Sequence, residues 1–378
     1  MGYHLLNLHL SQCEVFLGRS KNNNYSDKSK KDYQDLLFSL FEDIKASVNP
    51  STDIVEIFEK QEQLNFIFKS LEFLKDSTLN SIPFEVVSCL NLAMEDWIDT
   101  NAYIIVTSLN NNIAAYSYDP SLAFEDLLYN SMEVQYNISF PKRLVQINVP
   151  LALSRDYFSS VVLYHELGHF IDIYYNISKI IAFDLSHYND AQWQTLEPYF
   201  SFTPDIEHFK QNQDFLKSHI AEYFCDVFAS QYIGNTSNNY LEYITKNSPY
   251  FSFTHPSTIN RVKIVDDFLN NTQNPIVDLL TAYTLNITGK QIGKRHTTLN
   301  SWDFYKFVPI EIKNESELHG VFPYFWDIWL KGNEDFKVKS KVSNGLPHDK
   351  LYKMLNNLTE KTIGNYFIEK DWELTKQK

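Results

Sequence analysis

The sequence predicts an α+β fold that is mostly helical, with its β-strands confined to one short region. Apolar residues recur at helical spacing in several segments, of which residues 27–46 are the first. Strand-type patterns occur only between about residues 100 and 150. The chain of 378 residues contains 24 Tyr, 28 Phe and 6 Trp but only 10 Gly, which is typical of a packed protein rather than a disordered one.

The N-terminal part is expected to be helical. Residues 27–46 form one amphipathic helix, and a second follows Asn49 and Pro50, where residues 51–53 supply a start signal. Pro83 opens a third helix that runs to about Trp97.

The β-region is expected to hold four strands and one short helix. Residues 102–107 and 113–118 form a hairpin around the asparagine turn at 110–112. A short helix near residues 122–130 follows. Residues 134–140 and 144–149 are two further strands, separated at Pro141.

Helical patterns return at Ser154, a candidate helix cap, and continue to about Asn271. One of these helices covers about residues 215–233 and ends at Gly234. Beyond Asn271 we expect helices over residues 276–285, 322–330 and 351–367. The sequence therefore suggests a helical N-terminal region (1–82), a core (83–271) and a mainly helical C-terminal region (272–378).

Charge and cysteine content exclude several classes of protein. The formal net charge of −14 has the wrong sign for a nucleic-acid-binding protein. Three scattered cysteines favour a reducing compartment, so we expect a cytoplasmic protein. The first residues show no signal-peptide pattern, and no run of about 20 apolar residues predicts a membrane span.

Residues 165–169 read His-Glu-Leu-Gly-His, the pattern H-E-x-x-H. On a helix this spacing places His165 and His169 one turn apart on one face, where both can bind one zinc ion, with Glu166 beside the metal-bound water. Two exposed histidines on a surface helix are the alternative. Gly168 costs a helix about 1 kcal/mol relative to Ala, and a close approach by a neighbouring element would explain it.

A catalytic zinc takes three protein ligands, so a third is needed. The metzincin extension is excluded, because Asp172 and Tyr175 stand where it requires Gly and His or Asp. Glu222 is the preferred third ligand, since Asp226 shares its helix face and can accept a hydrogen bond from a ligating imidazole. His187 and His219 remain alternatives.

Taken together, these motifs resemble those of gluzincin metallopeptidases, especially the CAAX prenyl proteases and the bacterial membrane heat-shock protease. That group combines H-E-x-x-H with E-x-x-A-D and T-H-P-x-x-x-x-R, which correspond here to residues 165–169, 222–226 and 254–261. The resemblance implies a zincin-like fold, zinc on His165, His169 and Glu222, and Glu166 as general base. It also implies that Asp226 contacts a ligating residue without binding the metal itself, and that His255 and Arg261 lie near the site.

The resemblance has two departures and one further implication. Cys225 replaces the alanine of the second motif, which we interpret as packing, and the membrane members' transmembrane helices are absent. In the family an edge strand before the active helix binds the substrate, so residues 144–149 are its candidate, with an ordinary core strand as the equal alternative.

We therefore expect a zinc-dependent endopeptidase acting on a protein or peptide substrate. Glu166 would take a proton from a zinc-activated water, and His255 would hold the oxyanion, close the open zinc position reversibly, or merely cap a helix. The alternative hypothesis is a latent or non-catalytic zinc-binding regulator that acts by binding a partner protein. A purely structural zinc site is disfavoured, because such sites usually have four Cys or His ligands.

Overall fold

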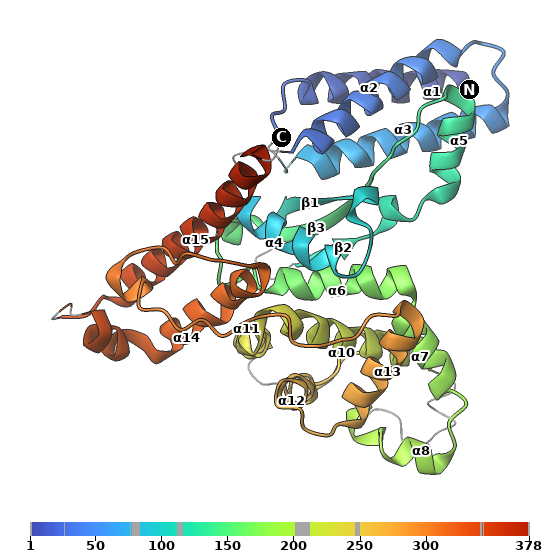
Figure 1. Ribbon diagram of the computed structural model, residues 1–378. Coiled ribbons are helices and arrows are strands. Elements are labelled where there is room, and N and C mark those ends of the chain that lie inside the picture. The colour runs from blue at the N-terminus through green and yellow to red at the C-terminus, as the bar shows by residue number, and fades with distance from the viewer. Residues whose placement is uncertain are drawn as a thin grey trace. The chain divides into compact units, whose positions relative to one another are not determined.

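The computed structural model describes residues 2–25, 27–75, 77, 84–111, 116–200, 212–245, 250–340, 342 and 344–376. It is mostly helical, with one three-stranded sheet in the described part, which confirms the α+β class (Figure 1). Its contacts divide the chain into two compact units. Unit 1 comprises Met1–Val87 and Ile98–Arg155, and unit 2 comprises Ser88–Trp97 and Asp156–Lys378.

Three helices begin unit 1: α1 (Gly2–Ser20), α2 (Lys28–Ser47) and α3 (Ile54–Lys75). Asp27 caps α2 by accepting a hydrogen bond from the amide of Ser29, and Asp53 accepts from two amides at the start of α3. Both helices occupy the predicted segments, whereas α1 was not anticipated.

The sheet of unit 1 has the order β1-β3-β2. Strands β1 (Tyr103–Asn110) and β3 (Arg143–Pro150) pair in parallel along their full length, and β2 (Ser117–Asp119) pairs antiparallel with β3. The predicted hairpin is therefore wrong within the described residues, since the two strands pair with β3 instead of each other. Residues 112–115 of that segment lie outside the described residues.

Two further expectations in this region are wrong. Helix α5 (Asp126–Tyr136) runs through Val134 and ends at Asn137 with φ 55°, so no strand begins at residue 134. Burial of Tyr129 and Met132 in the core outweighs the strand propensity of the segment. The candidate edge strand, residues 144–149, lies in the central strand of the sheet, and Gln146–Asn148 pair on both sides.

Unit 2 contains the end of α4 (Phe84–Glu95) and the helices that follow the sheet. Their bounds are α6 (Val162–Tyr175), α7 (Ile177–Leu185), α8 (Asp190–Gln194), α10 (Gln213–Ile233), α11 (Thr236–Thr245), α12 (Thr258–Leu269), α13 (Pro275–Thr288), α14 (Glu315–Ser340) and α15 (His348–Lys376). The predicted helix ending at Gly234 corresponds to α10, with Gly234 at φ 55°. Ser154 does not cap α6, because it closes a single 3-10 turn (Leu151–Leu153) before that helix.

Helices α6 and α10 pack unusually closely. A β-carbon built on Gly168 would lie 3.0 Å from the α-carbon of Cys225 and 3.2 Å from its sulfur. The glycine inside the H-E-x-x-H motif therefore permits the close approach, and Cys225 occupies a packing position against it. Both residues are buried.

The contact units differ from the three regions predicted from sequence. Ile104 and Val106 of β1 and Leu144 of β3 share one core with the buried faces of α1, α2 and α3. In unit 2, Phe158, just before α6, packs edge to face on Phe325 of α14. Sequence periodicity shows which face of an element is apolar but not which element that face will meet. Among the described helices, none combines the length and apolar character of a membrane span.

Candidate metal centre

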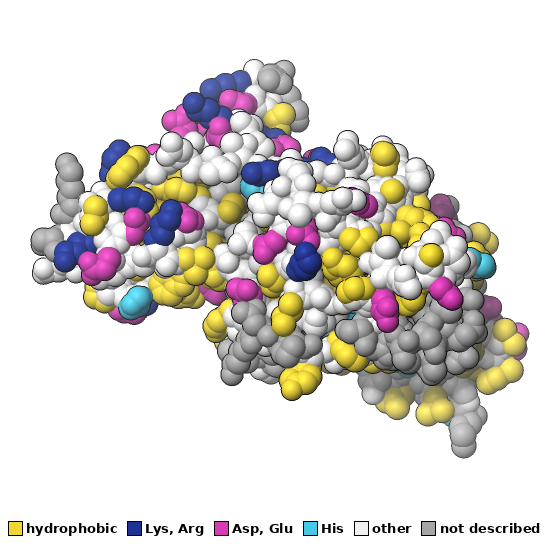
Figure 2. Space-filling model, turned by 90° about the horizontal axis from the view of Figure 1, so that it is seen from below, with side chains coloured by type: hydrophobic (Ala, Val, Ile, Leu, Met, Phe, Trp, Pro, Cys, Tyr) yellow, Lys and Arg dark blue, Asp and Glu magenta, His cyan; other side chains and the backbone are white. Residues whose placement is uncertain are grey.

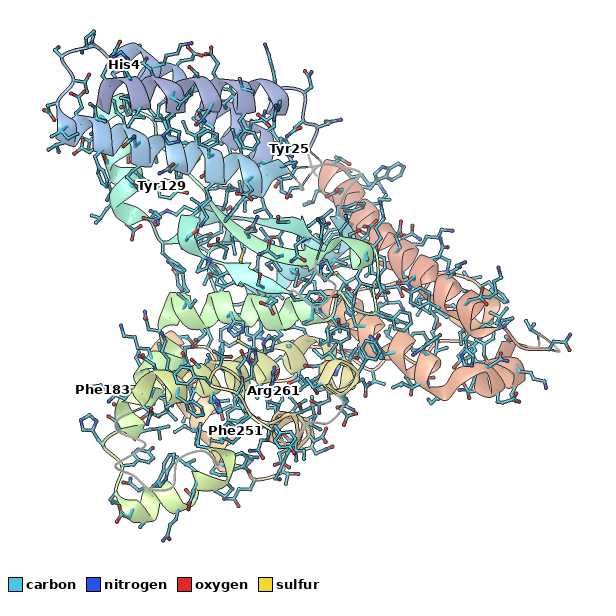
Figure 3. All side chains as sticks on the ribbon, turned by 180° about the vertical axis from the view of Figure 1, so that it is seen from behind. His4, Tyr25, Tyr129, Phe183, Phe251 and Arg261 are labelled. Carbon is cyan, nitrogen blue, oxygen red and sulfur yellow. The ribbon has the colours of Figure 1, made fainter. Side chains whose placement is uncertain are left out.

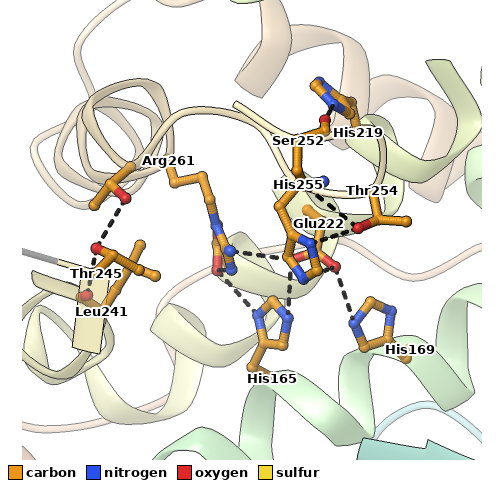
Figure 4. A network of polar contacts seen from close by, with 12 residues as sticks. His165, His169, His219, Glu222, Leu241, Thr245, Ser252, Thr254, His255 and Arg261 are labelled. Carbon is orange, nitrogen blue, oxygen red and sulfur yellow. Dashed lines mark hydrogen bonds and ion pairs between the residues drawn. The ribbon is translucent and has the colours of Figure 1, made fainter. Parts of the chain in front are cut away.

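The histidines of α6 face a carboxylate of α10 within unit 2 (Figure 4). Nε2 of His165 lies 3.4 Å from Oε2 of Glu222, and Nε2 of His169 lies 3.5 Å from Oε1 of the same carboxylate. The two histidines are one helical turn apart, with ring centroids separated by 4.9 Å. Three of the residues singled out in the sequence therefore meet at one point.

Their spacing fits a shared zinc ion. Ligand atoms about 2.0–2.1 Å from a tetrahedral zinc lie roughly 3.3 Å from each other, close to the observed 3.4 and 3.5 Å. Oε2 of Glu222 is buried, and the guanidinium of Arg261 lies 3.1 Å from it. Two imidazoles and one carboxylate at this spacing are a donor set that zinc accepts, so these residues fit a metal.

Asp226 and Arg261 contact the candidate ligands and hold them in position. Oδ1 of Asp226 lies 3.0 Å from Nδ1 of His165, leaving Nε2 directed at Glu222. Arg261, on α12, donates two hydrogen bonds of 2.7 Å to Asp226, and its NH1 lies 3.1 Å from Oε2 of Glu222. A carboxylate that holds a ligating imidazole is typical of zinc sites.

Burial and charge act in opposite directions on the pKa values of this cluster. Burial alone would lower the pKa of His165, but its hydrogen bond with Asp226 and the nearby negative charge of Glu222 raise it to about 10. Burial lowers the pKa of His169 to about 4. Burial also opposes ionisation of Glu222, yet Arg261 and the two histidines hold the pKa of that carboxyl well below its usual value. Glu222 is therefore an anion surrounded by cationic and imidazole groups.

Glu166 lies on α6 next to the first histidine, and it is buried. Burial raises the pKa of its carboxyl, and the negative charge of Glu222 acts in the same direction.

His255 reaches the same carboxylate from a loop before α12. Its Nε2 lies 3.6 Å from Oε1 of Glu222, while its Nδ1 bonds to the hydroxyl of Thr254 at 2.7 Å. The side chain is 57% exposed. Ser257 caps α12 through the amide of Asn260, so the helix-cap role proposed for His255 belongs to Ser257.

Cys225 competes with Glu222 as a third ligand. His165, His169 and Cys225 each offer an atom within 4.8 Å of the others. Zinc binds the thiolate, however, and burial together with nearby carboxylates raises the pKa of the Cys225 thiol well above its usual value. We favour Glu222, because it is already ionised and because its oxygens lie 3.4 and 3.5 Å from the Nε2 atoms of the two imidazoles.

The other two candidate ligands are occupied elsewhere. Nδ1 of His187, just beyond the end of α7, lies 3.0 Å from the carbonyl of Phe183 in that helix. Nε2 of His219 bonds to the carbonyl of Ser252 at 3.0 Å, and burial lowers the pKa of His219 to about 4. His219 therefore anchors the chain at Ser252, a role that sequence reasoning missed. Its position three residues before Glu222 places both side chains on one helix face.

The chain matches no family model, no curated protein and no solved structure in the comparisons made.

Proposed function

We propose that the protein is a zinc-dependent endopeptidase of the gluzincin type, with a zincin-like core that includes α6 and α10. The observation that carries the proposal is the position of Glu222, whose oxygens lie 3.4 and 3.5 Å from the Nε2 atoms of His165 and His169. The three groups match the ligand set of two His and one Glu found in catalytic zinc sites that retain an open position. The substrate is a protein or peptide.

Zinc bound by these residues supplies a Lewis acid that activates water and polarises a carbonyl group. Glu166 takes the proton of the attacking water and then gives it to the leaving amine as the C–N bond breaks. Asp226 holds His165 in the tautomer whose Nε2 faces the metal position. Arg261 fixes Asp226 through two hydrogen bonds and offsets the negative charge of the two carboxylates.

The position of His255 allows two roles in this function. Its exposed ring lies within reach of the site, where it can donate a hydrogen bond to the oxyanion formed during hydrolysis. Its 3.6 Å approach to Glu222 also resembles the spacing between two ligands of one ion. That second arrangement would complete four protein ligands, which favours the alternative of a latent zinc-binding regulator.

Zinc content and hydrolysis test the proposal together. We expect the purified protein to bind one zinc ion and to cleave casein or unstructured peptides, with loss of cleavage on chelation and recovery on zinc addition. Glu166→Gln should retain zinc and fold but lose nearly all hydrolysis, because it removes the base and leaves the ligands. A zinc-loaded wild type that never cleaves would favour the regulator, and loss of zinc in Glu166→Gln would refute the role of Glu166.

A further inference from the structure

Four functional side chains of α10 lie along one face of the helix. Phe215, His219, Glu222 and Asp226 are separated by four, three and four residues, which is the spacing of neighbours on a helix surface. The chain segment 250–261 contacts all four side chains of this row. Phe253 contacts Phe215, Ser252 contacts His219, His255 approaches Glu222, and Arg261 bonds to Asp226.

Hydrogen bonds hold the segment against the row (Figure 4). The carbonyl of Ser252 accepts from buried His219, and its amide donates to the carbonyl of His255 at 2.8 Å. The hydroxyl of Ser252 also accepts from the amide of His255 at 3.0 Å. Phe253 is thus fixed in a tight turn. On one side Ser252 is bonded to buried His219, and on the other the side chain of His255 reaches the metal position.

Two aromatic side chains of this segment, Phe251 and Phe253, remain exposed to solvent. Phe253 is 62% exposed although one edge of its ring packs on Phe215 at 5.5 Å, and Phe251 is 43% exposed. Phe251 lies in the same part of unit 2 as Arg261 in Figure 3. Exposed apolar side chains occur over much of the face shown in Figure 2. Two aromatics in a fixed turn beside the candidate metal site, however, indicate a binding function.

We propose that Phe253, with Phe251 beside it, forms the subsite that selects the substrate, by binding a large apolar side chain on a peptide in the site. This inference rests on the proposed peptidase function and adds its substrate preference. Phe215 lies seven residues from Glu222, or about 10 Å along the helix axis at 1.5 Å per residue. An extended peptide rises about 3.3 Å per residue, so the selected side chain lies roughly three residues from the cleaved bond.

A peptide scan tests the position of this subsite. One Phe is moved through each position of a peptide otherwise made of Ala, Ser and Gly, and the zinc-loaded wild type is assayed by mass spectrometry. We expect cleavage about three residues from the Phe, on one side of it. Cleavage with no dependence on the position of the Phe would overturn the inference while leaving the peptidase function intact.

A substitution tests the residue. Phe253→Ala should lower kcat/KM about 10- to 30-fold for the Phe-containing peptide, because the peptide's Phe loses its apolar partner, and should lower it much less for a peptide without Phe. Trp372→Ala is the matched control, since Trp372 is 67% exposed on α15. An equal loss for both peptides, or the same loss in the control, would refute a selective role.

Binding gives a readout that does not depend on turnover. Fluorescence anisotropy of the labelled peptides with zinc-loaded Glu166→Gln should show tighter binding of the Phe-containing peptide, and adding Phe253→Ala should remove the difference. If this preference appears while the wild type cleaves no peptide, the subsite stands and the peptidase function fails. If the wild type neither cleaves nor binds these peptides, both proposals are wrong.

Discussion

Gly168→Ala is the most direct test of how the two site helices pack. Alanine is the better helix former by about 1 kcal/mol, so helix propensity alone predicts a more stable protein. The structure predicts the opposite. The new β-carbon would lie 3.0 Å from the α-carbon of Cys225 and 3.2 Å from both its β-carbon and its sulfur.

The size of the effect follows from these distances. Carbon atoms prefer separations of about 3.5–4.0 Å, so α6 and α10 must separate by roughly 0.5–1 Å. The closest atom belongs to the backbone of a buried helix and cannot rotate away. Overpacking of this kind costs about 1–3 kcal/mol, and the upper half of that range, less the gain in propensity, leaves a net loss of about 1–2 kcal/mol.

The same displacement should weaken zinc binding. Glu222 lies on α10 one turn before Cys225, so it moves with that helix while His165 and His169 remain on α6. Metal sites tolerate deviations of about 0.2 Å in ligand distance, which is smaller than the expected shift. We therefore expect at least about a 10-fold loss of zinc affinity.

Urea denaturation and zinc competition with a chelator measure the two effects. Gly18→Ala is the matched control, because Gly18 lies in α1 and its added β-carbon would meet nothing within 4 Å. This control should gain about 0.5–1 kcal/mol. Adding Cys225→Ala to Gly168→Ala should restore stability only in part, since the contact with the α-carbon remains. If Gly168→Ala were as stabilising as Gly18→Ala and bound zinc normally, the reasoning from close packing would be wrong.

Three further predictions concern the ligands, the loop and a buried histidine. Glu222→Ala should abolish measurable zinc binding and Asp226→Ala should weaken it about 10- to 100-fold, whereas Cys225→Ala should retain zinc. If Cys225→Ala lost zinc in a titration and Glu222→Ala retained it, Cys225 would be the third ligand instead. Loss of the His255 ring in His255→Ala should lower turnover about 100- to 1000-fold at unchanged zinc affinity if it holds the oxyanion, but should weaken zinc and raise activity if it closes the site. Wild-type turnover together with wild-type zinc affinity in His255→Ala would exclude both the oxyanion role and the closing role. Burial lowers the pKa of His319 to about 3, so the folded state favours its neutral form. Its contribution to stability is complete above pH 6.5 and is lost as the pH falls toward 3, by about 2 kcal/mol at pH 5. His319→Gln should reduce the difference between urea midpoints at pH 7 and pH 5, and an unchanged difference would contradict this.

Local patterns predicted many of the helices correctly, but they failed where long-range packing decides the structure. Val134 has the side chain of a strand former, yet α5 continues through it because Met132 and Tyr129 bury on the helical face. The predicted hairpin failed because β3, a segment farther along the chain, pairs with both other strands. Helix α1 was missed even though Leu6, Leu10, Cys13 and Leu17 show the spacing of a buried helix face.

The sequence by itself determined which side chains share a helix face. His165 and His169 are one turn apart, as are Glu222 and Asp226, because a helix places residues i and i+4 on the same side whatever surrounds it. The motifs therefore predicted the chemical types of the candidate site and its assignment to two helices. They could not show that these helices meet.

Only the tertiary structure brings the pair His165 and His169 into contact with the pair Glu222 and Asp226. The absent side chain of Gly168 lets Cys225 approach to contact distance, and this brings Glu222 within 3.5 Å of both imidazoles. The turn at Ser252 and the start of α12 then bring His255 and Arg261 to the same carboxylate. Such contacts depend on the fit of surfaces that are distant in sequence, for which the spacing along one helix carries no information.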